Sequence, residues 1–194
     1  MGSGKSTVGH LLRQMGFAVL DADQVARKVL SPGSAAESEV FKTFGQQLKD
    51  AHGHLDRRAL GRLVFGDPDR LEKLEGLIHP HVRAEVSSER ARLAAAGHQV
   101  AFYDVPLLFE KNMRDQFDHV LVISTDKNLR DQRLKVRSQL SEEEIEERTS
   151  RHLPAALKEA AASAVICNSG SVEDLNREVR QVLLKLSIRL PPST

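Results

Sequence analysis

The sequence predicts an α/β fold in which helices cover both faces of a parallel sheet. Four short apolar runs of strand length lie at 17–20, 100–105, 119–124 and 164–167. Stretches with apolar residues at helical spacing separate these runs, so crossover helices join the strands and the strands pair in parallel. The helical stretch at 24–97 is too long for a single crossover, and we expect it to form an inserted helical subdomain.

The balance of charges narrows the class of partner. Among 194 residues, 28 Lys and Arg stand against 27 Asp and Glu, which gives a formal net charge of +1. This balance provides no general attraction to nucleic acid or to a membrane surface, and we expect neither as a partner. The sequence contains no run of 18 apolar residues and no secretory leader pattern, so we expect a cytoplasmic protein that is a monomer or a weak homo-oligomer.

Local signals place the boundaries of the helices. A helix with an apolar face is predicted after residue 4 and ends at Gly16. Asp56 and Asp67 are expected to begin two later helices, and Pro80 to end one helix and open the next, because proline cannot donate the backbone hydrogen bond. The single cysteine, Cys167, excludes an intrachain disulfide, and we expect it to be buried within its apolar strand.

The segment Gly2-Ser3-Gly4-Lys5-Ser6-Thr7 matches the second half of a Walker A motif. In that motif, backbone N–H groups at a helix N-terminus bind phosphate oxygens, the lysine binds the β- and γ-phosphates, and the next hydroxyl ligates Mg²⁺. Lys5 and Ser6 are the candidates for these two roles, and the predicted fold is a P-loop NTPase-type three-layer α/β/α fold. The other predicted ATP-binding residues of the segment are Gly2, Ser3, Gly4 and Thr7.

The Walker A match is incomplete at its start. Its first glycine and the strand that normally feeds the loop would lie before Met1, so we expect a working protein with about ten more residues, the length of a strand and a short loop. The alternative interpretation of the segment is a polar helix start without nucleotide binding.

Two carboxylates follow the strand at 17–20. Asp21 and Asp23 are expected to point the same way, toward the sheet edge at which ligands bind. A carboxylate that faces the γ-phosphate can accept the proton of an attacking hydroxyl, which makes Asp23 the candidate base. Alternatively, Asp23 caps the helix that begins near Gln24. Asp104, at the end of the strand at 100–105, would hold Mg²⁺ through water or would only form a turn.

A basic segment follows the strand at 119–124. Arg133 and Arg137 lie one helical turn apart and share a face, which suits phosphate binding and transition-state charge, whereas a solvated helix face is the alternative. Ser141 is expected to open a further helix that reaches about His152. His79, before Pro80, would bind substrate or simply end a helix.

Together these residues resemble the dephospho-coenzyme A kinase family. The likeness rests on Gly2–Thr7, on Leu20-Asp21-Ala22-Asp23 with Arg27, and on the run from Asp104 to Glu110, which reads Asp-Val-Pro-Leu-Leu-Phe-Glu. The family transfers the γ-phosphoryl group of ATP to the ribose 3′-hydroxyl of dephospho-coenzyme A, the last step of coenzyme A biosynthesis. The resemblance implies a core at 1–23, 98–129 and 153–190, a coenzyme-A-binding subdomain at 24–97 and a lid at 130–152.

The resemblance also implies roles for individual residues. Asp23 would be the base for the 3′-hydroxyl with Asp21 in support, and Arg27 and His79 would line the acceptor side. The remaining implied roles are catalysis by Lys5 and Arg137, ATP binding by Arg133 and Arg137, and Mg²⁺ binding by Ser6 and Asp104.

One position departs from the family pattern, because His152 replaces the glutamine that commonly follows Arg148 by four residues. Two other functions stay open. One is a different small P-loop kinase that acts on a nucleotide or sugar hydroxyl. The other, if Met1 is the true start, is a nucleotide-binding module without catalysis.

Overall fold

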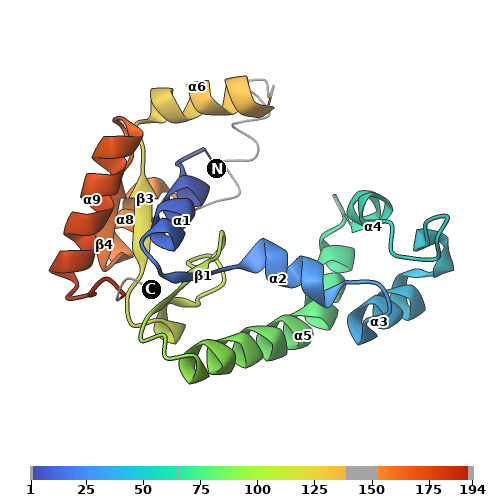
Figure 1. The fold of residues 1–194 in the computed structure, drawn as a ribbon. Coiled ribbons are helices and arrows are strands. Elements are labelled where there is room, and N and C mark those ends of the chain that lie inside the picture. The colour runs from blue at the N-terminus through green and yellow to red at the C-terminus, as the bar shows by residue number, and fades with distance from the viewer. Residues whose placement is uncertain (1, 65, 139–152, 192–194) are drawn as a thin grey trace. The chain divides into compact units, whose positions relative to one another are not determined.

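The computed structural model describes residues 2–64, 66–138 and 153–191, and they form a mixed α/β protein (Figure 1). The four predicted strands are confirmed as β1 (Ala18–Asp21), β2 (Ala101–Asp104), β3 (Leu121–Ser124) and β4 (Ala164–Cys167). β3 and β4 run parallel, with Leu121 opposite Ala164. In the described part of the chain the strands form two two-stranded sheets, β1 with β2 and β3 with β4, where we expected one parallel sheet.

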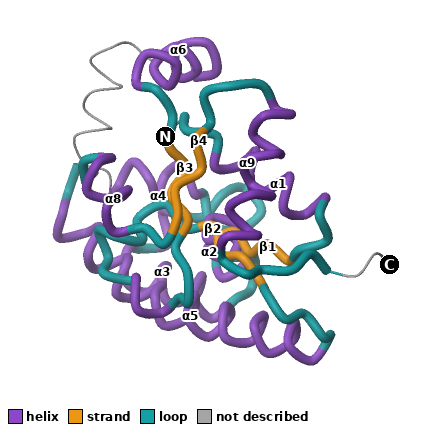
Figure 2. The backbone as a smooth tube through the Cα atoms, turned by 90° about the vertical axis from the view of Figure 1, so that its left-hand side faces the viewer, coloured by secondary structure: helices purple, strands orange, loops and turns teal. Residues whose placement is uncertain are grey.

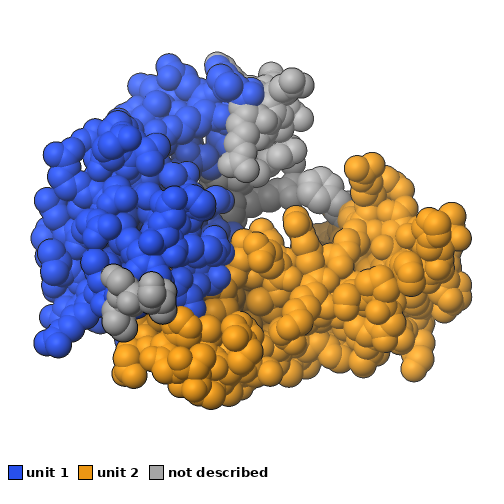
Figure 3. Space-filling view, viewed as in Figure 1, with its two compact units in different colours: residues 1–19, 104–194 blue, residues 20–103 orange. Residues whose placement is uncertain are grey.

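The chain divides into two compact units (Figure 3). Unit 1 consists of residues 1–19 and 104–194, and unit 2 of residues 20–103. Unit 1 contains α1 (Lys5–Gln14), the short 3₁₀ turn η2 (Arg114–Gln116), α6 (Lys127–Ser138), α8 (Ala155–Ala161) and α9 (Val172–Lys185). Unit 2 contains α2 (Ala22–Val29), α3 (Ala35–Phe44), the 3₁₀ turn η1 (Gln46–Leu48), α4 (Arg57–Val64) and α5 (Pro68–Ala95).

The core of unit 1 lies around β4. α9 packs on β4 and on α1, and α8 packs on β3, as the tube in Figure 2 lets the reader follow. Ile166 of β4 is fully buried. A capping box begins α9, because Ser171 Oγ accepts a hydrogen bond from the backbone N–H of Asp174, and Asp174 accepts one from the N–H of Ser171. The buried residues on the apolar faces of α1 and α9 are Val8, Leu11, Leu12, Leu175, Val179, Val182 and Leu183.

A carboxylate ties the loop after β2 to α8. Glu110 Oε1 accepts hydrogen bonds from Lys158 Nζ at 2.6 Å and from the backbone N–H of Leu153 at 3.1 Å. Burial alone would raise the pKa of Glu110, but the hydrogen bonds from Lys158 and from backbone N–H groups outweigh it and lower the pKa to about 2. The motif residue Glu110 is therefore held as a carboxylate within unit 1.

Unit 2 is mainly helical, and its described helices share an apolar core. Asp56 Oδ1 accepts hydrogen bonds from the backbone N–H groups of Arg58 and Ala59, and Asp67 accepts one from that of Arg70, which confirms both predicted caps. The buried members of the core are Val25, Val29, Leu30, Ala36, Val40, Phe41, Leu48, Leu55, Leu60, Val64 and Leu74.

A buried carboxylate also joins two loops of unit 2. The side chain of Glu37, on α3, is 4% exposed. Its Oε2 accepts a hydrogen bond from the N–H of Gly33 at 2.6 Å, and its Oε1 accepts one from the N–H of Leu55 at 2.9 Å. Each carboxylate oxygen therefore has a backbone N–H donor, one from the loop before α3 and one from a loop after it.

The predicted break at Pro80 is wrong, because α5 continues through this residue. The apolar stripe passes across it: Leu74 is in the core, and Ile78 and Val82 pack against it. This burial offsets the cost of an interior proline, about 3 kcal/mol. The residue four positions earlier, whose carbonyl faces the proline ring, is Gly76, which has open space around it and can adjust its backbone.

The predicted burial of Cys167 is also wrong, since this side chain is exposed. Successive side chains of a strand point to opposite faces, and its neighbour Ile166 takes the buried face of β4. None of the described helices is long and apolar enough to span a membrane.

Candidate active site

The N-terminus of α1 carries the predicted phosphate-binding segment. Gly4 is its N-cap residue, with a φ of 88° that favours glycine. A Cβ on Gly4 would lie 2.0 Å from Asn168 Nδ2, so any other residue there would have to displace the Asn168 amide. The side chains of Lys5, Ser6 and Thr7 are exposed at the start of the helix. The first N–H groups of a helix lack carbonyl partners within it and favour anions, so this terminus is suited to a phosphate group.

The other glycine of the segment packs against α6. Gly2 has a φ of 75°, and a Cβ there would lie 2.9 Å from Leu134 Cγ and 3.1 Å from Arg130 Cγ. Arg130 is itself paired with Asp131, with Nη2 and Oδ1 2.9 Å apart. Gly2 thus permits the close approach of the Gly2–Thr7 segment to α6.

Lys5 and Asp104 form an ion pair between the start of α1 and the end of β2. The Lys5 side chain is 44% exposed and that of Asp104 is 13% exposed. The structure therefore brings together the motif lysine and the carboxylate that was predicted to hold Mg²⁺. Lys5 is the first residue of α1, so its side chain extends from the helix end at which a phosphate would bind.

Two residues that the sequence reasoning missed hold the phosphate-binding segment in place. The Ser3 carbonyl accepts hydrogen bonds from Asn168 Nδ2 at 2.7 Å and from Thr125 Oγ1 at 3.0 Å. Arg133 Nη1 donates to the carbonyl of Asn168 at 3.1 Å, which links the predicted arginine to the same cluster. Thr125 and Asn168 each follow directly after a strand, and this position could have identified them, since ligands bind at strand ends in α/β proteins.

The predicted lid is described only in part. Arg137 lies in α6, and its side chain is outside the described part of the structure. Arg148, His152 and the helix predicted to begin at Ser141 fall within residues 139–152, outside the described residues.

In unit 2, Asp21 and Asp23 have different local roles. Asp21 caps α2, because its Oδ1 accepts hydrogen bonds from the N–H groups of Asp23, at 2.8 Å, and Gln24, at 3.1 Å. The alternative interpretation of Asp23 as the cap is therefore wrong. Asp23 lies in the first turn of α2 with an exposed side chain, and Arg27, also exposed, follows one turn later.

Tyr103 is a further residue of this region that the sequence reasoning missed. Burial raises the pKa of Tyr103, and the nearby charges of Asp21 and Asp23 raise it further. Its phenol therefore stays protonated at neutral pH. The end of β2 could have signalled it, since Tyr103 directly precedes Asp104.

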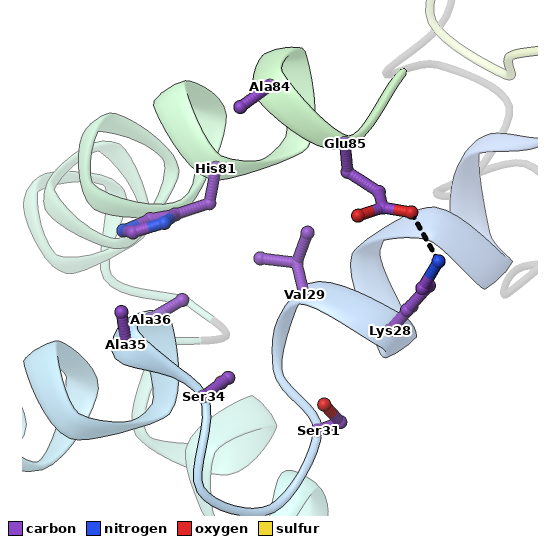
Figure 4. Close-up of a pocket in the computed structure, with 9 residues that line it drawn as sticks. All are labelled: Lys28, Val29, Ser31, Ser34, Ala35, Ala36, His81, Ala84 and Glu85. Carbon is purple, nitrogen blue, oxygen red and sulfur yellow. Dashed lines mark hydrogen bonds and ion pairs between the residues drawn. The ribbon is translucent and has the colours of Figure 1, made fainter. Parts of the chain in front are cut away.

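A pocket of about 460 Å³ opens between α2, the start of α3 and α5 (Figure 4). Lys28 and Glu85 are paired on one side of it, with Nζ and Oε1 2.5 Å apart. His81, another lining residue, lies 3.2 Å from Glu39, Nε2 to Oε2. The predicted acceptor residues Arg27 and His79 do not line the pocket, and His79 is exposed elsewhere on α5. The other lining residues are Val29, Ser31, Ser34, Ala35, Ala36 and Ala84.

The predicted Mg²⁺ ligands are oxygen donors. A hydroxyl from Ser6 and a carboxylate from Asp104 suit a hard cation that keeps several waters and binds phosphate oxygens as well. Within the described residues there is no cluster of three or more His, Cys, Asp or Glu side chains that could hold a metal ion by itself. One hydroxyl and one carboxylate would leave the rest of the coordination shell of such a cation to water and phosphate oxygens.

A family model described as dephospho-CoA kinase matches residues 1–174 of the chain. The chain belongs to the dephospho-CoA kinase family. Family members catalyse the final step of coenzyme A biosynthesis. A dephospho-CoA kinase of Bdellovibrio bacteriovorus is 44% identical over 180 residues, which cover 93% of this chain and 89% of that one. A dephospho-CoA kinase of Anaeromyxobacter dehalogenans is 41% identical over 184 residues, which cover 95% of this chain and 87% of that one.

Solved structures agree with this membership. The structure of a dephospho-CoA kinase from Campylobacter jejuni has a TM-score of 0.70 and 28% identity, and the match covers 96% of this chain and 93% of that one. The structure of TT1252 from Thermus thermophilus has a TM-score of 0.81 and 39% identity, with the same coverage of 96% and 93%. The mixed α/β fold is therefore the one found in the dephospho-CoA kinase family.

Proposed function

We propose that this chain transfers the γ-phosphoryl group of ATP to the ribose 3′-hydroxyl of dephospho-coenzyme A. The observation that carries the proposal is the Lys5–Asp104 ion pair at the N-terminus of α1. In this proposal, Lys5 would supply the cation that binds phosphate and Asp104 the carboxylate that holds the metal, beside a helix end that favours anions. Family membership supplies the acceptor substrate.

Binding of the phosphates falls to unit 1 in this proposal. Lys5 and the N–H groups of the first turn of α1 would hold the β- and γ-phosphates, and Arg133 and Arg137 would stabilise charge on the transferred group. Mg²⁺, when bound, neutralises charge on the phosphates, and Ser6 and Asp104 would hold it. The other proposed ATP contacts are Gly2, Ser3, Gly4 and Thr7.

Proton transfer falls to Asp23. As the γ-phosphoryl group leaves ADP, a P–O bond forms to the 3′-oxygen, and the carboxylate of Asp23 accepts the hydroxyl proton. Two features support this role: Asp23 is exposed, and the hydrogen bond from its N–H to Asp21 fixes its backbone. Arg27, one turn along α2, and His79 would bind the acceptor.

The setting of the reaction is also proposed. The net charge of +1 gives no general attraction to nucleic acid or lipid, so we place the enzyme in the cytoplasm with small molecules as its partners. We expect a monomer or a weak homo-oligomer.

The decisive assay is ATP–Mg²⁺-dependent conversion of dephospho-coenzyme A to coenzyme A, followed by chromatography. Turnover by this chain supports the proposal. If the chain folds and binds ATP but does not turn over, the substrate is wrong, and nucleosides, nucleotides and sugars would be tested as acceptors for another small P-loop kinase. Lack of turnover with every acceptor would leave a nucleotide-binding module.

The role of Asp23 has a matched control in the same chain. Asp69 occupies the same second helical position of α5 that Asp23 occupies in α2, and an aspartate cap precedes each of them. Asp23→Asn is expected to keep ATP affinity and lower kcat by about 10²–10⁴-fold, the usual contribution of a general base. Asp69→Asn loses the same helix-dipole interaction and should keep the wild-type kcat. A near wild-type rate for Asp23→Asn would exclude it as the base.

A further inference from the structure

Asn168 is a buried polar residue whose hydrogen bonds join three parts of unit 1. It is 6% exposed. Its backbone N–H donates to the Ser124 carbonyl at 2.8 Å, at the end of β3. Its side-chain amide donates to the Ser3 carbonyl at 2.7 Å, and its backbone carbonyl accepts from Arg133 Nη1 at 3.1 Å. One residue thus contacts a strand end, the phosphate-binding segment and α6.

The chemistry of the contact with Ser3 requires an amide. A backbone carbonyl can only accept hydrogen bonds, so the group that faces it must be the NH₂ of Asn168 and not its oxygen. A second donor, Thr125 Oγ1, reaches the same carbonyl at 3.0 Å. Both lone pairs of the Ser3 oxygen are therefore used by side chains, which fixes the direction of the peptide group between Ser3 and Gly4.

We propose that Asn168 is a positioning residue for the ATP subsite. By holding the Ser3 carbonyl on its side chain and Arg133 on its backbone, it sets the phosphate-binding segment and the arginine of α6 in one geometry. This inference rests on the proposed function in one respect, that the nucleotide bound by the Gly2–Thr7 segment is ATP.

The expected effect is selective for the nucleotide. The groups that Asn168 contacts belong to the phosphate-binding segment, to β3 and to α6, all in unit 1. The proposed acceptor residues Asp23, Arg27 and His79 lie in unit 2. A loss of the Asn168 hydrogen bond should therefore weaken ATP binding and leave the affinity for dephospho-coenzyme A unchanged. A general loss of stability would not separate the two substrates.

Asn168→Asp tests this directly, because it keeps the size of the side chain and replaces the NH₂ donor with an oxygen that repels the Ser3 carbonyl. The Kd for ATP–Mg²⁺, measured by calorimetry, and the KM for ATP should rise by about tenfold or more. The KM for dephospho-coenzyme A should stay within about twofold of wild type, the scale of surface changes. Asn176→Asp is the control: Asn176, on α9, bonds Arg180 and lies outside the cluster.

A second pair of variants covers the case in which Asn168→Asp does not fold. Thr125→Val removes the other donor to Ser3, and Thr125→Ser keeps the hydroxyl. Thr125→Val is expected to raise the Kd for ATP by about threefold to tenfold, and Thr125→Ser to restore it.

Two results would overturn the proposal: wild-type ATP affinity in the folded variants that lack a donor, or an equal rise in KM for both substrates. The calorimetric Kd needs no turnover. A wild-type chain that binds ATP but does not phosphorylate dephospho-coenzyme A would therefore refute the proposed function and still leave the role of Asn168 decided by the comparison of Kd values.

Discussion

Replacing Gly4 with alanine tests the packing around the phosphate-binding segment. The new Cβ would lie 2.0 Å from Asn168 Nδ2, whereas ordinary contact begins at 3.4 Å, so the Asn168 side chain must move by more than 1 Å. That movement breaks its 2.7 Å hydrogen bond to the Ser3 carbonyl. Because Asn168 is buried, the displaced amide has little room to find another partner.

The magnitude follows from three contributions. An alanine in the left-handed region costs about 1–2 kcal/mol, overpacking adds about 1–3 kcal/mol, and loss of a neutral hydrogen bond adds about 1 kcal/mol. Comparison with Gly16→Ala separates the costs of overpacking and of the lost hydrogen bond from the conformational cost. It lies just beyond the other end of α1 with the same φ of 88°, and a Cβ there would lie 3.5 Å from Pro191, an ordinary contact. Gly16→Ala therefore carries the conformational cost without the collision.

The assay is urea denaturation of both variants beside wild type. Gly16→Ala should lower the free energy of unfolding by about 1–2 kcal/mol, and Gly4→Ala by about 2–4 kcal/mol more than that, with unchanged m-values. Gly4→Ala should also weaken ATP binding, whereas Gly16→Ala should not. Equal destabilisation by the two variants would mean that Asn168 does not restrict the space at Gly4, and the reasoning would fail.

Three further predictions address charge and burial. Glu110→Gln should lower the free energy of unfolding by about 1.5–3 kcal/mol at pH 7; because the pKa of Glu110 is about 2 in the folded protein and its ordinary value is 4.5, urea titrations should show this advantage of wild type above pH 4.5 shrinking as the pH falls toward 2. Lys5→Ala should lower kcat/KM by the factor that corresponds to a loss of about 2–4 kcal/mol of transition-state stabilisation. Lys127→Ala, at the first position of α6, is the control and should leave the kinetics unchanged. Equal effects of the two variants would remove Lys5 from the mechanism. Ile166→Ala should cost about 2–5 kcal/mol in urea denaturation, and Cys167→Ala beside it less than about 0.5 kcal/mol; similar losses would contradict the burial pattern of β4.

The strands and caps were predictable because their signals are local. The apolar runs gave all four strands, and Asp56 and Asp67 cap the predicted helices. Pro80 misled because a local rule for helix ends competes with an apolar stripe that continues across it, and packing prevails. Cys167 misled because four apolar residues in a row do not say which face of the strand is covered.

The sequence identified the site residues that belong to a motif. It did not identify those whose role depends only on contacts between distant parts of the chain. Lys5 and Asp104 were both selected from the sequence, but their ion pair joins residues 99 positions apart. Asn168 and Thr125 carry no motif, and their role depends on a carbonyl more than 120 residues away. Asp21 and Asp23 were both selected from the sequence, and only the hydrogen bonds distinguish the cap from the exposed carboxylate.

The buried carboxylate of Glu37 limits how unit 2 can be redesigned. Its two oxygens are each matched to one backbone N–H, from Gly33 and from Leu55, in loops on either side of α3. Lengthening either loop would move a donor away and leave a buried negative charge without its partner, which costs far more than the chain entropy of a longer loop. Insertions of tags or reporter peptides in unit 2 should therefore avoid both loops and use the exposed turn at Gly97, where an added Cβ would meet open space.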